Sequence, residues 1–561
     1  MIERMKTLCA LPGPSGCEDA VREFVLEQVK PYADEIRTDA IGNVMVFRKG
    51  KKALERPVVL CAHMDEVGVI IKKITDDGML KFGFVGGVDP RVVIGRPVRF
   101  GDVQGVIGIK AVHLTTAEER RTMPKTKDLY IDIGAASKAA AEDKVSLGDY
   151  GVFETGMGVV SPVGIGVDAF WNALLSGKSG VTPITEFDPT DFPVKIAGEV
   201  KDFDPVKYVG DKKTVRHMDR NAQFAVAAAK MAAQDAKLDM SVEDPNRVGT
   251  IIGTGIGGIK TMEDTVERIE KRGPGKVNPF AVPMMIANMA SGMVSITFGL
   301  QGPVLTDVTA CASGNNALGR ATRMIQWGDA DVMFAGGTEA AVAKTPMAGF
   351  AAMHALSSRE CPPEEASCPF DVRRDGFVLG EGSGVLILEE LEHAKKRGAH
   401  IYAEVIGYGT NGDAYHITAP RPGGELAARC MKNAIADAGI SPEDIDYINA
   451  HGTSTGLNDK NETKAIKEVL GQHAYDIVVN STKSMTGHLL GAAGAIEAVV
   501  CVLSIMNNKV HQTLNLQTPD PECDLHYAAE GPEDRKVDVT MSNAFGFGGH
   551  NAVVIMRRYE E

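Results

Sequence analysis

The feature that most constrains the fold of this chain is a change of sequence pattern near residue 154. Up to that point, short β-rich runs such as "VGVIIKKI" are separated by glycine turns, which predicts a small barrel. From residue 155 onward, apolar strands alternate with long alanine-rich helices such as "RNAQFAVAAAKMAAQDAK", the pattern of layered α/β folds with buried sheets. The 561 residues also exceed the roughly 250–300 that one core holds, so we expect more than one domain.

The composition narrows the class of protein. Apolar residues make up 44% of the chain, as in soluble globular proteins, and a net charge of −14 argues against bulk nucleic-acid binding. The nine cysteines form no CxxC pair, which indicates a reduced protein, and the first residues lack the apolar core of a signal peptide. Because the most apolar run, "AAGAIEAVVCVLSIM", contains Glu497, we predict a cytoplasmic protein that does not enter the membrane.

Two glycine motifs suggest chemistry that their surroundings do not support. "GTGIGG" (253–258) follows a strand and precedes a charged helix, without the second strand and acidic residue of a dinucleotide-binding unit. "GTSTG" (452–456) matches the serine-hydrolase elbow, but "LNDKNET" after it is predicted to be a loop, where an elbow needs a helix. We therefore favour neither nicotinamide binding nor serine hydrolysis.

Cys311 is the first candidate catalytic residue. In "LTDVTACASGNNALGRATRMI" a run of β-type residues ends at this cysteine, and small residues then lead into a helix. A cysteine at a helix N-terminus has its thiolate stabilised by the macrodipole and the free N–H groups. A buried structural cysteine remains an equal alternative on this segment alone.

Two histidines strengthen the catalytic interpretation. "IDYINAHGTST" is a second apolar strand that ends at His451, and "IVVNSTKSMTGHLL" is a third, followed by a helix that begins near His488. Ligands bind at such strand ends in open α/β sheets, so we expect Cys311, His451 and His488 to share one site. The helix N-terminus should keep His488 neutral, as a hydrogen-bond donor.

A charged pair and a glycine-rich loop also belong to the expected site. Glu497 lies in an apolar helix, where an unpaired charge is costly, so we predict a buried cationic partner, with Lys483 as first choice. The loop in "MSNAFGFGGHNAVVIM" has three glycines around Phe545 and Phe547. Such a loop can aim a backbone N–H at a carbonyl oxygen while an aromatic ring swings over a pocket.

From residue 155 to the C-terminus the chain resembles the elongating β-ketoacyl-[acyl-carrier-protein] synthases of the thiolase superfamily. The motifs that carry the resemblance appear in the family's order: "TGMGVVSPVG", "TACASG", "PFDVRRDGFVLGEGSG", "DAYHITAP", "NAHGTSTGLND", "STKSMTGHLLGAAGAIE" and "FGFGGHN". The resemblance implies a thiolase-like layered αβαβα fold built from two similar halves, at 155–405 and 406–561. It also implies a decarboxylative Claisen condensation that needs no cofactor and no metal.

The resemblance assigns roles to particular residues. Cys311 would accept the acyl chain, His451 and His488 would stabilise the malonyl-derived enolate, and Lys483 and Glu497 would order the histidine region. The backbone N–H groups of Cys311 and Phe547 would form the oxyanion hole. The predicted substrate-binding residues are the acyl-pocket gate Ile256 and the phosphopantetheine contacts Thr418, Thr453 and Thr455.

The same resemblance implies partners. Acyl carrier protein is acidic, so its docking face should be basic, and the matching positions here include Lys213, Arg216 and Lys276. His217, Gly275 and His354 stand where better-known members have basic residues, which favours weaker or differently placed docking. The family members are homodimers. A polyketide-type ketosynthase is the alternative within the same class.

Residues 1–154 resemble the start of the glutamyl-aminopeptidase-like dinuclear metallopeptidases, through "LPGPSGCEDAVREFV", "DAIGNV", "AHMDEVG" and "GDYGVF". In that family His63 would bind metal and Asp65 would orient the site, but the other ligands come later in the chain, and here the pattern changes first. We therefore predict an incomplete, inactive site. A metallo-aminopeptidase relative and an inactive fusion chimera, destabilised by Glu154 in a central strand, remain alternatives.

Overall fold

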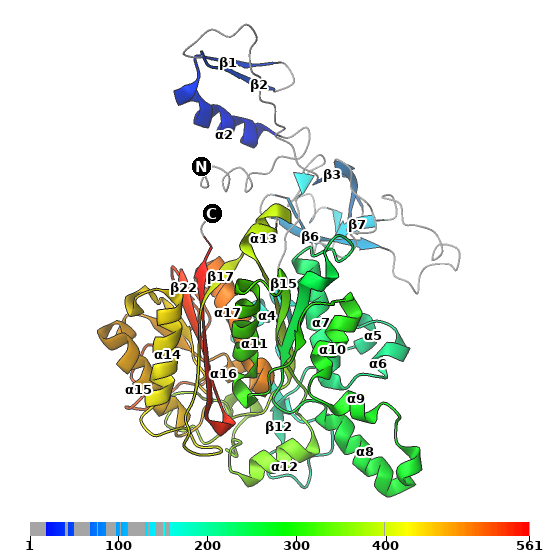
Figure 1. Ribbon diagram of the computed structural model, residues 1–561, viewed down its shortest axis with the longest axis vertical. Helices are drawn as coiled ribbons and strands as arrows, with labels where there is room; N and C mark the ends of the chain where they lie inside the picture. Colours follow the sequence, from blue (N-terminus) through cyan, green and yellow to red (C-terminus); the bar gives the residue numbers. More distant parts are fainter. Residues whose placement is uncertain are drawn as a thin grey trace. The chain divides into compact units, whose positions relative to one another are not determined.

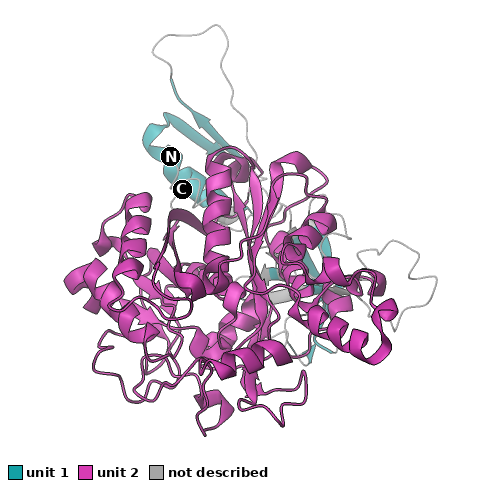
Figure 2. Ribbon diagram, turned by 60° about the horizontal axis from the view of Figure 1, so that its bottom comes forward, with its two compact units in different colours: residues 1–154, 560–561 teal, residues 155–559 magenta. Residues whose placement is uncertain are grey.

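The computed structural model describes residues 157–397 and 399–559, together with shorter stretches between residues 18 and 151. Two compact units make up the chain, residues 1–154 with 560–561, and residues 155–559 (Figure 2). The described residues do not include His63, Asp65 or Glu154. The predictions made for these three residues therefore stay predictions.

Unit 1 is rich in strands, as predicted. A helix, α2 (Asp19–Val29), is followed by the hairpin of β1 (Glu35–Thr38) and β2 (Val44–Phe47). A six-stranded antiparallel sheet has the order β5-β6-β7-β4-β3-β8, and its edge strands β5 and β8 also contact each other, as in a small barrel. Its strands are β3 (Gly68–Ile74), β4 (Leu80–Val85), β5 (Pro97–Phe100), β6 (Val103–Ile109), β7 (Leu129–Asp132) and β8 (Tyr150–Gly151).

A β-bulge explains how "GVIIKKI" packs as strand β3. Strict alternation would put Val69 and Ile71 on one face and Ile74 on the other. The register with β4 shifts between Ile71 and Lys73, which returns Ile74 to the buried face and leaves Lys72 and Lys73 exposed. Val69, Ile71 and Ile74 therefore all enter the core of unit 1.

Unit 2 contains two sheets with one topology. The first has the order β10-β9-β16-β15-β13-β14 and the second the order β17-β23-β22-β18-β19. Without the edge strand β10, each sheet has five strands. When these five are numbered in their order along the chain, their order across the sheet is 1-5-4-2-3 in both halves, and the parallel and antiparallel pairs also match. The prediction of two similar halves is therefore confirmed. The strands are β9 (Met157–Ser161), β10 (Gly164–Ile165), β13 (Val248–Gly253), β14 (Val304–Leu305), β15 (Val332–Glu339), β16 (Gly382–Glu389), β17 (Ala403–Gly412), β18 (Tyr447–Asn449), β19 (Val478–Asn480), β22 (Val539–Gly546) and β23 (His550–Arg558).

Helices complete five layers, αβαβα, as predicted (Figure 1). The outer face of the first sheet carries α7 (Arg220–Asp235) and α10 (Met289–Phe298), and α14 (Glu425–Ala438) covers the second sheet with α15 (Asn458–Leu470) beside it. Helices α11 (Ser313–Gln326) and α17 (Ala493–Asn507) pack between the two sheets. The prediction that "LNDKNET" forms a loop was wrong, because Asn458 already begins α15. The buried positions of this helix recur at helical spacing.

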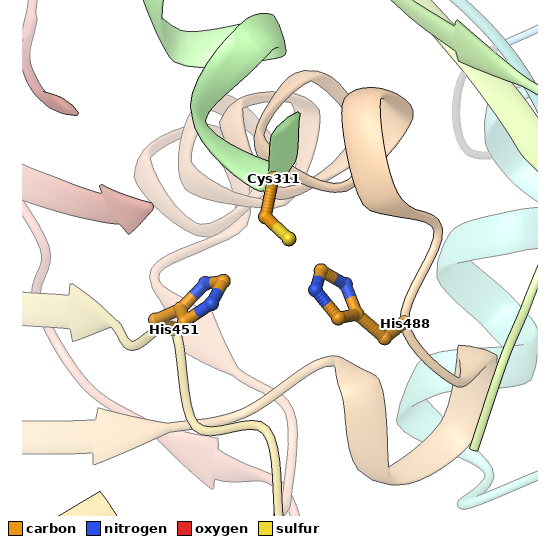
Figure 3. A group of neighbouring side chains, drawn as sticks. All are labelled: Cys311, His451 and His488. Atoms are coloured by element: carbon orange, nitrogen blue, oxygen red, sulfur yellow. The ribbon is translucent and has the colours of Figure 1, made fainter. Parts of the chain in front are cut away.

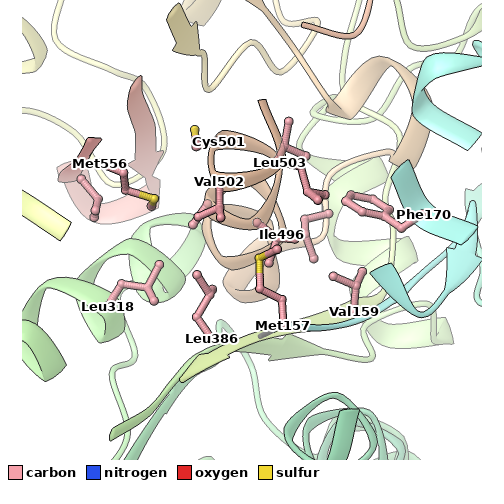
Figure 4. Packing of buried hydrophobic residues seen from close by; sticks show 14 of the residues in the cluster. Met157, Val159, Phe170, Leu318, Leu386, Ile496, Cys501, Val502, Leu503 and Met556 are labelled. Atoms are coloured by element: carbon pink, nitrogen blue, oxygen red, sulfur yellow. The ribbon is translucent and has the colours of Figure 1, made fainter. Parts of the chain in front are cut away.

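Helix α17 is the centre of the largest core (Figure 4). Side chains from both sheets and from α11 surround it, among them Met157, Leu318, Leu386 and Met556. The stretch Leu490–Asn507 is long and apolar enough to cross a membrane, but 89% of it is buried inside the fold. An all-round apolar helix is what a central layer requires, since every face of it meets another element.

Further helices and two short strand pairs accompany these layers. They are α4 (Val167–Leu175), α5 (Pro205–Tyr208), α6 (Lys212–Val215), α8 (Ile259–Arg272), α9 (Ala281–Met285), α12 (Lys344–Ala352), α13 (Leu391–Arg397), α16 (Lys483–Thr486), and the strand pairs β11 (Val181–Pro183) with β12 (Ile196–Gly198) and β20 (Lys509–Val510) with β21 (Glu533–Asp534).

The first strand of each half pairs with the last strand of the same half, and the described part of β9 begins at Met157. β17 pairs with β23 from Ala403 to Gly412, whereas β9 pairs with β16 over four residues, Met157–Val160. A cavity of about 440 Å³ lies beside the start of β9, lined by Met157 and by Ile387 to Glu389 of β16. The domain boundary predicted at residue 405 falls inside β17.

Candidate active site

Cys311 lies at the entrance of α11, in the short 3₁₀ helix η7 (Ala310–Ala312). Ala310 before it has φ +49°, a left-handed conformation that non-glycine residues rarely adopt and that occurs at functional turns. The expectation of a stabilised thiolate was wrong for the resting site. Burial raises the pKa of the Cys311 thiol to about 12, although Lys483 and two backbone N–H groups act in the opposite direction.

His451 and His488 reach Cys311 from two other loops (Figure 3). His451 follows β18, and His488 lies between α16 and the 3₁₀ helix η11 (Leu490–Ala492). The cysteine sulfur and one nitrogen of each imidazole all lie within 4.8 Å of one another, and the ring centroids are 5.3 Å apart. The sequence therefore predicted correctly that these three side chains meet.

Both imidazoles are neutral at physiological pH. Burial, and after it the positive charge of Lys483, lowers the pKa of His451 and of His488 well below the ordinary histidine value. A neutral His488 was predicted, and the causes that lower its pKa are burial first and the charge of Lys483 second. A neutral imidazole can donate one hydrogen bond without giving up its proton.

The buried charge of Glu497 is paired as predicted. Its Oε1 accepts a hydrogen bond from Lys483 Nζ at 2.5 Å, and both side chains are almost fully buried. Burial raises the pKa of Glu497 to about 7, against the lowering effect of Lys483. Lys483 begins α16, five residues before His488, so the pair connects the central helix to the segment that carries the histidine.

The glycine-rich loop brings a backbone N–H to the nucleophile. Phe547 opens η12 (Phe547–Gly549) between β22 and β23, and its N–H and that of Cys311 both lower the Cys311 pKa. A Cβ on Gly546 would meet Thr309 O at 2.8 Å and Cys311 N at 3.1 Å, so only glycine permits this close approach. Two amides facing one sulfur can receive the oxygen of a thioester formed on it.

The three side chains lie in a cavity of about 330 Å³. Thr418, Thr453 and Thr455 line it, and Thr453 Oγ1 lies 3.0 Å from Thr455 Oγ1, while their contact with a phosphopantetheine arm stays a prediction. The remainder of the lining is mixed, with apolar groups such as Phe377 and Leu490 and charged groups such as Asp375 and Arg421. Ile256 is absent from this lining and is 36% exposed, so its function as an acyl gate stays a prediction.

Comparison with known proteins identifies the group to which this architecture belongs. The family "Beta-ketoacyl synthase, N-terminal domain" matches residues 152–394, and "Beta-ketoacyl synthase, C-terminal domain" matches residues 402–517. The 3-oxoacyl-[acyl-carrier-protein] synthase 2 of Synechocystis sp. is 52% identical over 73% of this chain and 98% of its own length. The protein of the same name from Coxiella burnetii is 53% identical over 72% of this chain and 97% of its own length.

The chain belongs to the β-ketoacyl synthase family. A solved ketosynthase of a type II polyketide synthase, in complex with its acyl-carrier protein and bound to the hexaketide, is 42% identical, with a TM-score of 0.67. The match between the two structures covers 72% of this chain and 98% of the solved ketosynthase chain. The family "M42 glutamyl aminopeptidase" matches residues 42–165, in agreement with the resemblance of the N-terminal segment.

Two buried carboxylates of this synthase were missed in the sequence. Glu462 on α15 accepts the backbone N–H groups of His451 and Gly452, both at 2.8 Å. Glu339, at the end of β15, accepts from Thr254 Oγ1 at 3.0 Å and from the N–H groups of Gly255 and Gly491. Burial raises the pKa of both carboxyls. An acidic residue that closes an all-apolar strand, as in "VMFAGGTE", was the available signal for Glu339.

The predicted docking residues of the synthase are exposed and lie on neighbouring elements. Lys213 belongs to α6, Arg216 follows it, and Lys276 ends the 3₁₀ helix η6 (Pro274–Lys276). The rings of His217 and Phe280 lie 4.2 Å apart, which joins these two segments.

Proposed function

We propose that this protein is an elongating 3-oxoacyl-[acyl-carrier-protein] synthase of type II fatty acid biosynthesis, an acyltransferase. The observation that carries the proposal is the buried set of Cys311, His451 and His488 beside the N–H of Phe547. Relatives that are 52% and 53% identical over almost their whole length have this name. The polyketide ketosynthase is less similar, at 42%, so the fatty-acid function is favoured over polyketide extension.

The first half-reaction transfers the acyl chain to Cys311. The sulfur attacks the carbonyl carbon of the acyl carrier thioester, and the N–H groups of Cys311 and Phe547 hold the negative oxygen of the tetrahedral intermediate. The bond from that carbon to the phosphopantetheine sulfur then breaks. The proton of the Cys311 thiol ends on the departing thiol, so the exchange is balanced without a cofactor.

The second half-reaction condenses the acyl group with a malonyl unit. The neutral imidazoles of His451 and His488 donate hydrogen bonds to the malonyl thioester oxygen while the bond to the carboxyl carbon breaks and CO2 leaves. The enolate carbon attacks the Cys311 thioester, and the cysteine sulfur leaves and takes up a proton. Loss of CO2 provides the driving force, so the reaction needs neither a metal nor a redox group.

The other predicted residues support this sequence of steps. The Lys483–Glu497 pair orders the segment before His488 and places a positive charge near the developing enolate. Thr418, Thr453 and Thr455 offer hydroxyl groups along the cavity, where a phosphopantetheine arm would lie. Ile256 gates the acyl pocket.

Acyl carrier protein is the proposed partner, docked on the face formed by Lys213, Arg216 and Lys276. Reversing the charges with Lys213→Glu and Arg216→Glu should raise KM for carrier-linked substrates and leave KM for a short acyl thioester of free pantetheine unchanged. If turnover on the carrier-linked substrate is unchanged, the docking site lies elsewhere.

A homodimer and a cytoplasmic location complete the proposal. Strand β14 is the edge of the first sheet, and its Val304 and Leu305 are exposed beside Val308 and Ile296, which is 69% exposed. An apolar, unpaired edge favours a second copy of the chain as its cover. Light scattering should give twice the chain mass, and Val304→Lys should give a monomer.

The deciding experiment is intact-protein mass spectrometry after incubation with an acyl carrier thioester. One acyl group should appear on the wild-type chain, map to Cys311, and be absent from Cys311→Ser. The condensation product after addition of malonyl carrier protein should be longer by one two-carbon unit. A product with several unreduced keto groups would favour the polyketide alternative, and no adduct on Cys311 would defeat the proposal.

Unit 1 is proposed to have no peptidase activity, because the change of pattern after residue 154 leaves out the later metal ligands of that family. Incubation with cobalt or zinc and a glutamyl anilide substrate should give no hydrolysis. Hydrolysis that is lost in His63→Ala would instead favour a metallo-aminopeptidase relative.

A further inference from the structure

We propose that Cys311, His451 and His488 also form a reversible inhibitory site for a zinc-type divalent ion. Their sulfur and nitrogen atoms are the only group of three or more such ligand atoms that converge within the described part of the chain. One thiolate and two imidazoles are ligands that Zn²⁺ prefers, and three protein ligands leave a fourth position for water.

The geometry is close to what such an ion requires. With Zn–S near 2.3 Å and Zn–N near 2.0–2.1 Å, tetrahedral ligand atoms lie about 3.3–3.6 Å apart. Here the three atoms already lie within 4.8 Å of one another (Figure 3), so small side-chain rotations on an unchanged backbone can close the set. Those backbones are held in place, since Glu462 accepts the His451 N–H and His488 N–H donates to Val378 O at 2.7 Å.

The two imidazoles are available to bind a metal ion. Nδ1 of His451 and Nδ1 of His488 are buried and have no hydrogen-bond partner among the described residues. Each ring can therefore rotate to present a lone pair without breaking a hydrogen bond of that atom. The nearby Lys483 opposes a cation, but its charge is balanced by Glu497 at 2.5 Å.

Binding is a balanced exchange of a proton for a metal. A zinc–sulfur bond forms at Cys311 and the thiol proton passes to water, while each histidine nitrogen donates an electron pair and a water keeps the fourth position. The bound sulfur can no longer attack a thioester. Conversely, an acylated Cys311 has lost its thiolate, so acylation and metal binding exclude each other.

Cobalt provides a spectroscopic test on the full chain, because thiolate-bound Co²⁺ shows a sulfur-to-metal charge-transfer band. We expect one equivalent of Co²⁺ with this band, its loss in Cys311→Ser and after acylation, and weaker binding in His451→Ala and His488→Ala. Cys361→Ser, at a partly exposed cysteine outside the site, and His63→Ala, in unit 1, should both retain it. Circular dichroism checks that each variant is folded.

A second readout is independent of any variant. Zinc at ten times its Kd should slow alkylation of Cys311 by iodoacetamide about tenfold, since only the free fraction reacts, and a chelator should restore the rate. The proposal is overturned if Co²⁺ gives the same spectrum with Cys311→Ser, or if zinc leaves the alkylation rate of Cys311 unchanged. The proposed condensing function is not affected by either result.

Discussion

Lys483 and Glu497 form a buried ion pair with Nζ and Oε1 2.5 Å apart, beside the site and at the centre of the fold. Removing one partner leaves a buried charge uncompensated, which costs about 3–5 kcal/mol, whereas replacing both with apolar groups costs far less. Chemical denaturation at pH 8, where Glu497 is ionised, should therefore show Lys483→Met and Glu497→Leu each strongly destabilised, and the double variant closer to the wild type. Additive losses in the double variant would contradict this.

The same pair makes stability depend on pH. Because burial raises the pKa of Glu497 to about 7, the folded chain binds more protons than the unfolded chain between about pH 4.5 and 7. This contribution is fully present below the unfolded pKa and is lost as the pH rises through the folded value. The stability advantage of the wild type over the double variant should shrink from pH 5 to pH 8, measured as the difference in free energy of unfolding. A growing advantage would show that the carboxyl stays ionised.

His488→Ala should separate the two half-reactions. Removing this hydrogen-bond donor from the enolate should slow malonyl decarboxylation about 10²–10³-fold, as loss of one oxyanion donor does. Acylation of Cys311, seen by mass spectrometry, should continue because its two amide donors are on other segments. Equal loss of both steps would mean that the histidine acts on the cysteine instead. Since the pKa of His488 lies well below its ordinary value, the wild-type decarboxylation rate should stay constant from pH 6 to pH 8.

Gly546→Ala should impair acylation. The added Cβ would meet Thr309 O at 2.8 Å and Cys311 N at 3.1 Å, which displaces the Phe547 N–H from the nucleophile. We expect the rate of Cys311 acylation to fall about 10²-fold, with the thermal midpoint within a few degrees of the wild type. Gly349→Ala on α12 is the matched control, because its Cβ would meet nothing within 4 Å. Equal rates in the two variants would remove Phe547 from the oxyanion hole.

Much of this site could be predicted from sequence because each catalytic residue ends or follows a local pattern. Cys311, His451 and His488 each follow an apolar run, and strand ends of one layered fold meet. Glu462 and Glu339 act through bonds to residues distant in the chain, so local periodicity does not reveal them. The ionisation of Cys311 was predicted wrongly because burial depends on the whole fold, and burial raises the pKa of the thiol more than Lys483 and the two backbone N–H groups lower it.

At the start of unit 2, strand β16 lies between β9 and β15. Glu390 N donates to the O of Asp331, the residue just before β15, so by strand alternation the backbone groups of Ile387 and Glu389 face the β9 side. β9 pairs with β16 only as far as the Met157–Leu386 pair, and no described residue continues it there. We predict from the sequence that Glu154 lies in this strand, and the register of Gly158 with Val385 would then put position 154 opposite Glu389.

Two carboxylates at directly opposed positions repel, which costs up to about 1 kcal/mol in a sheet. Glu154→Val and Glu154→Lys should therefore both raise the free energy of unfolding of the synthase unit, by about 1 kcal/mol. Valine would add an apolar strand residue, and lysine would add an opposite charge beside Glu389. Glu530→Val, at an exposed position, is the control and should change the same free energy by less than about 0.5 kcal/mol. If Glu154→Lys destabilises the chain, the register does not continue to this position.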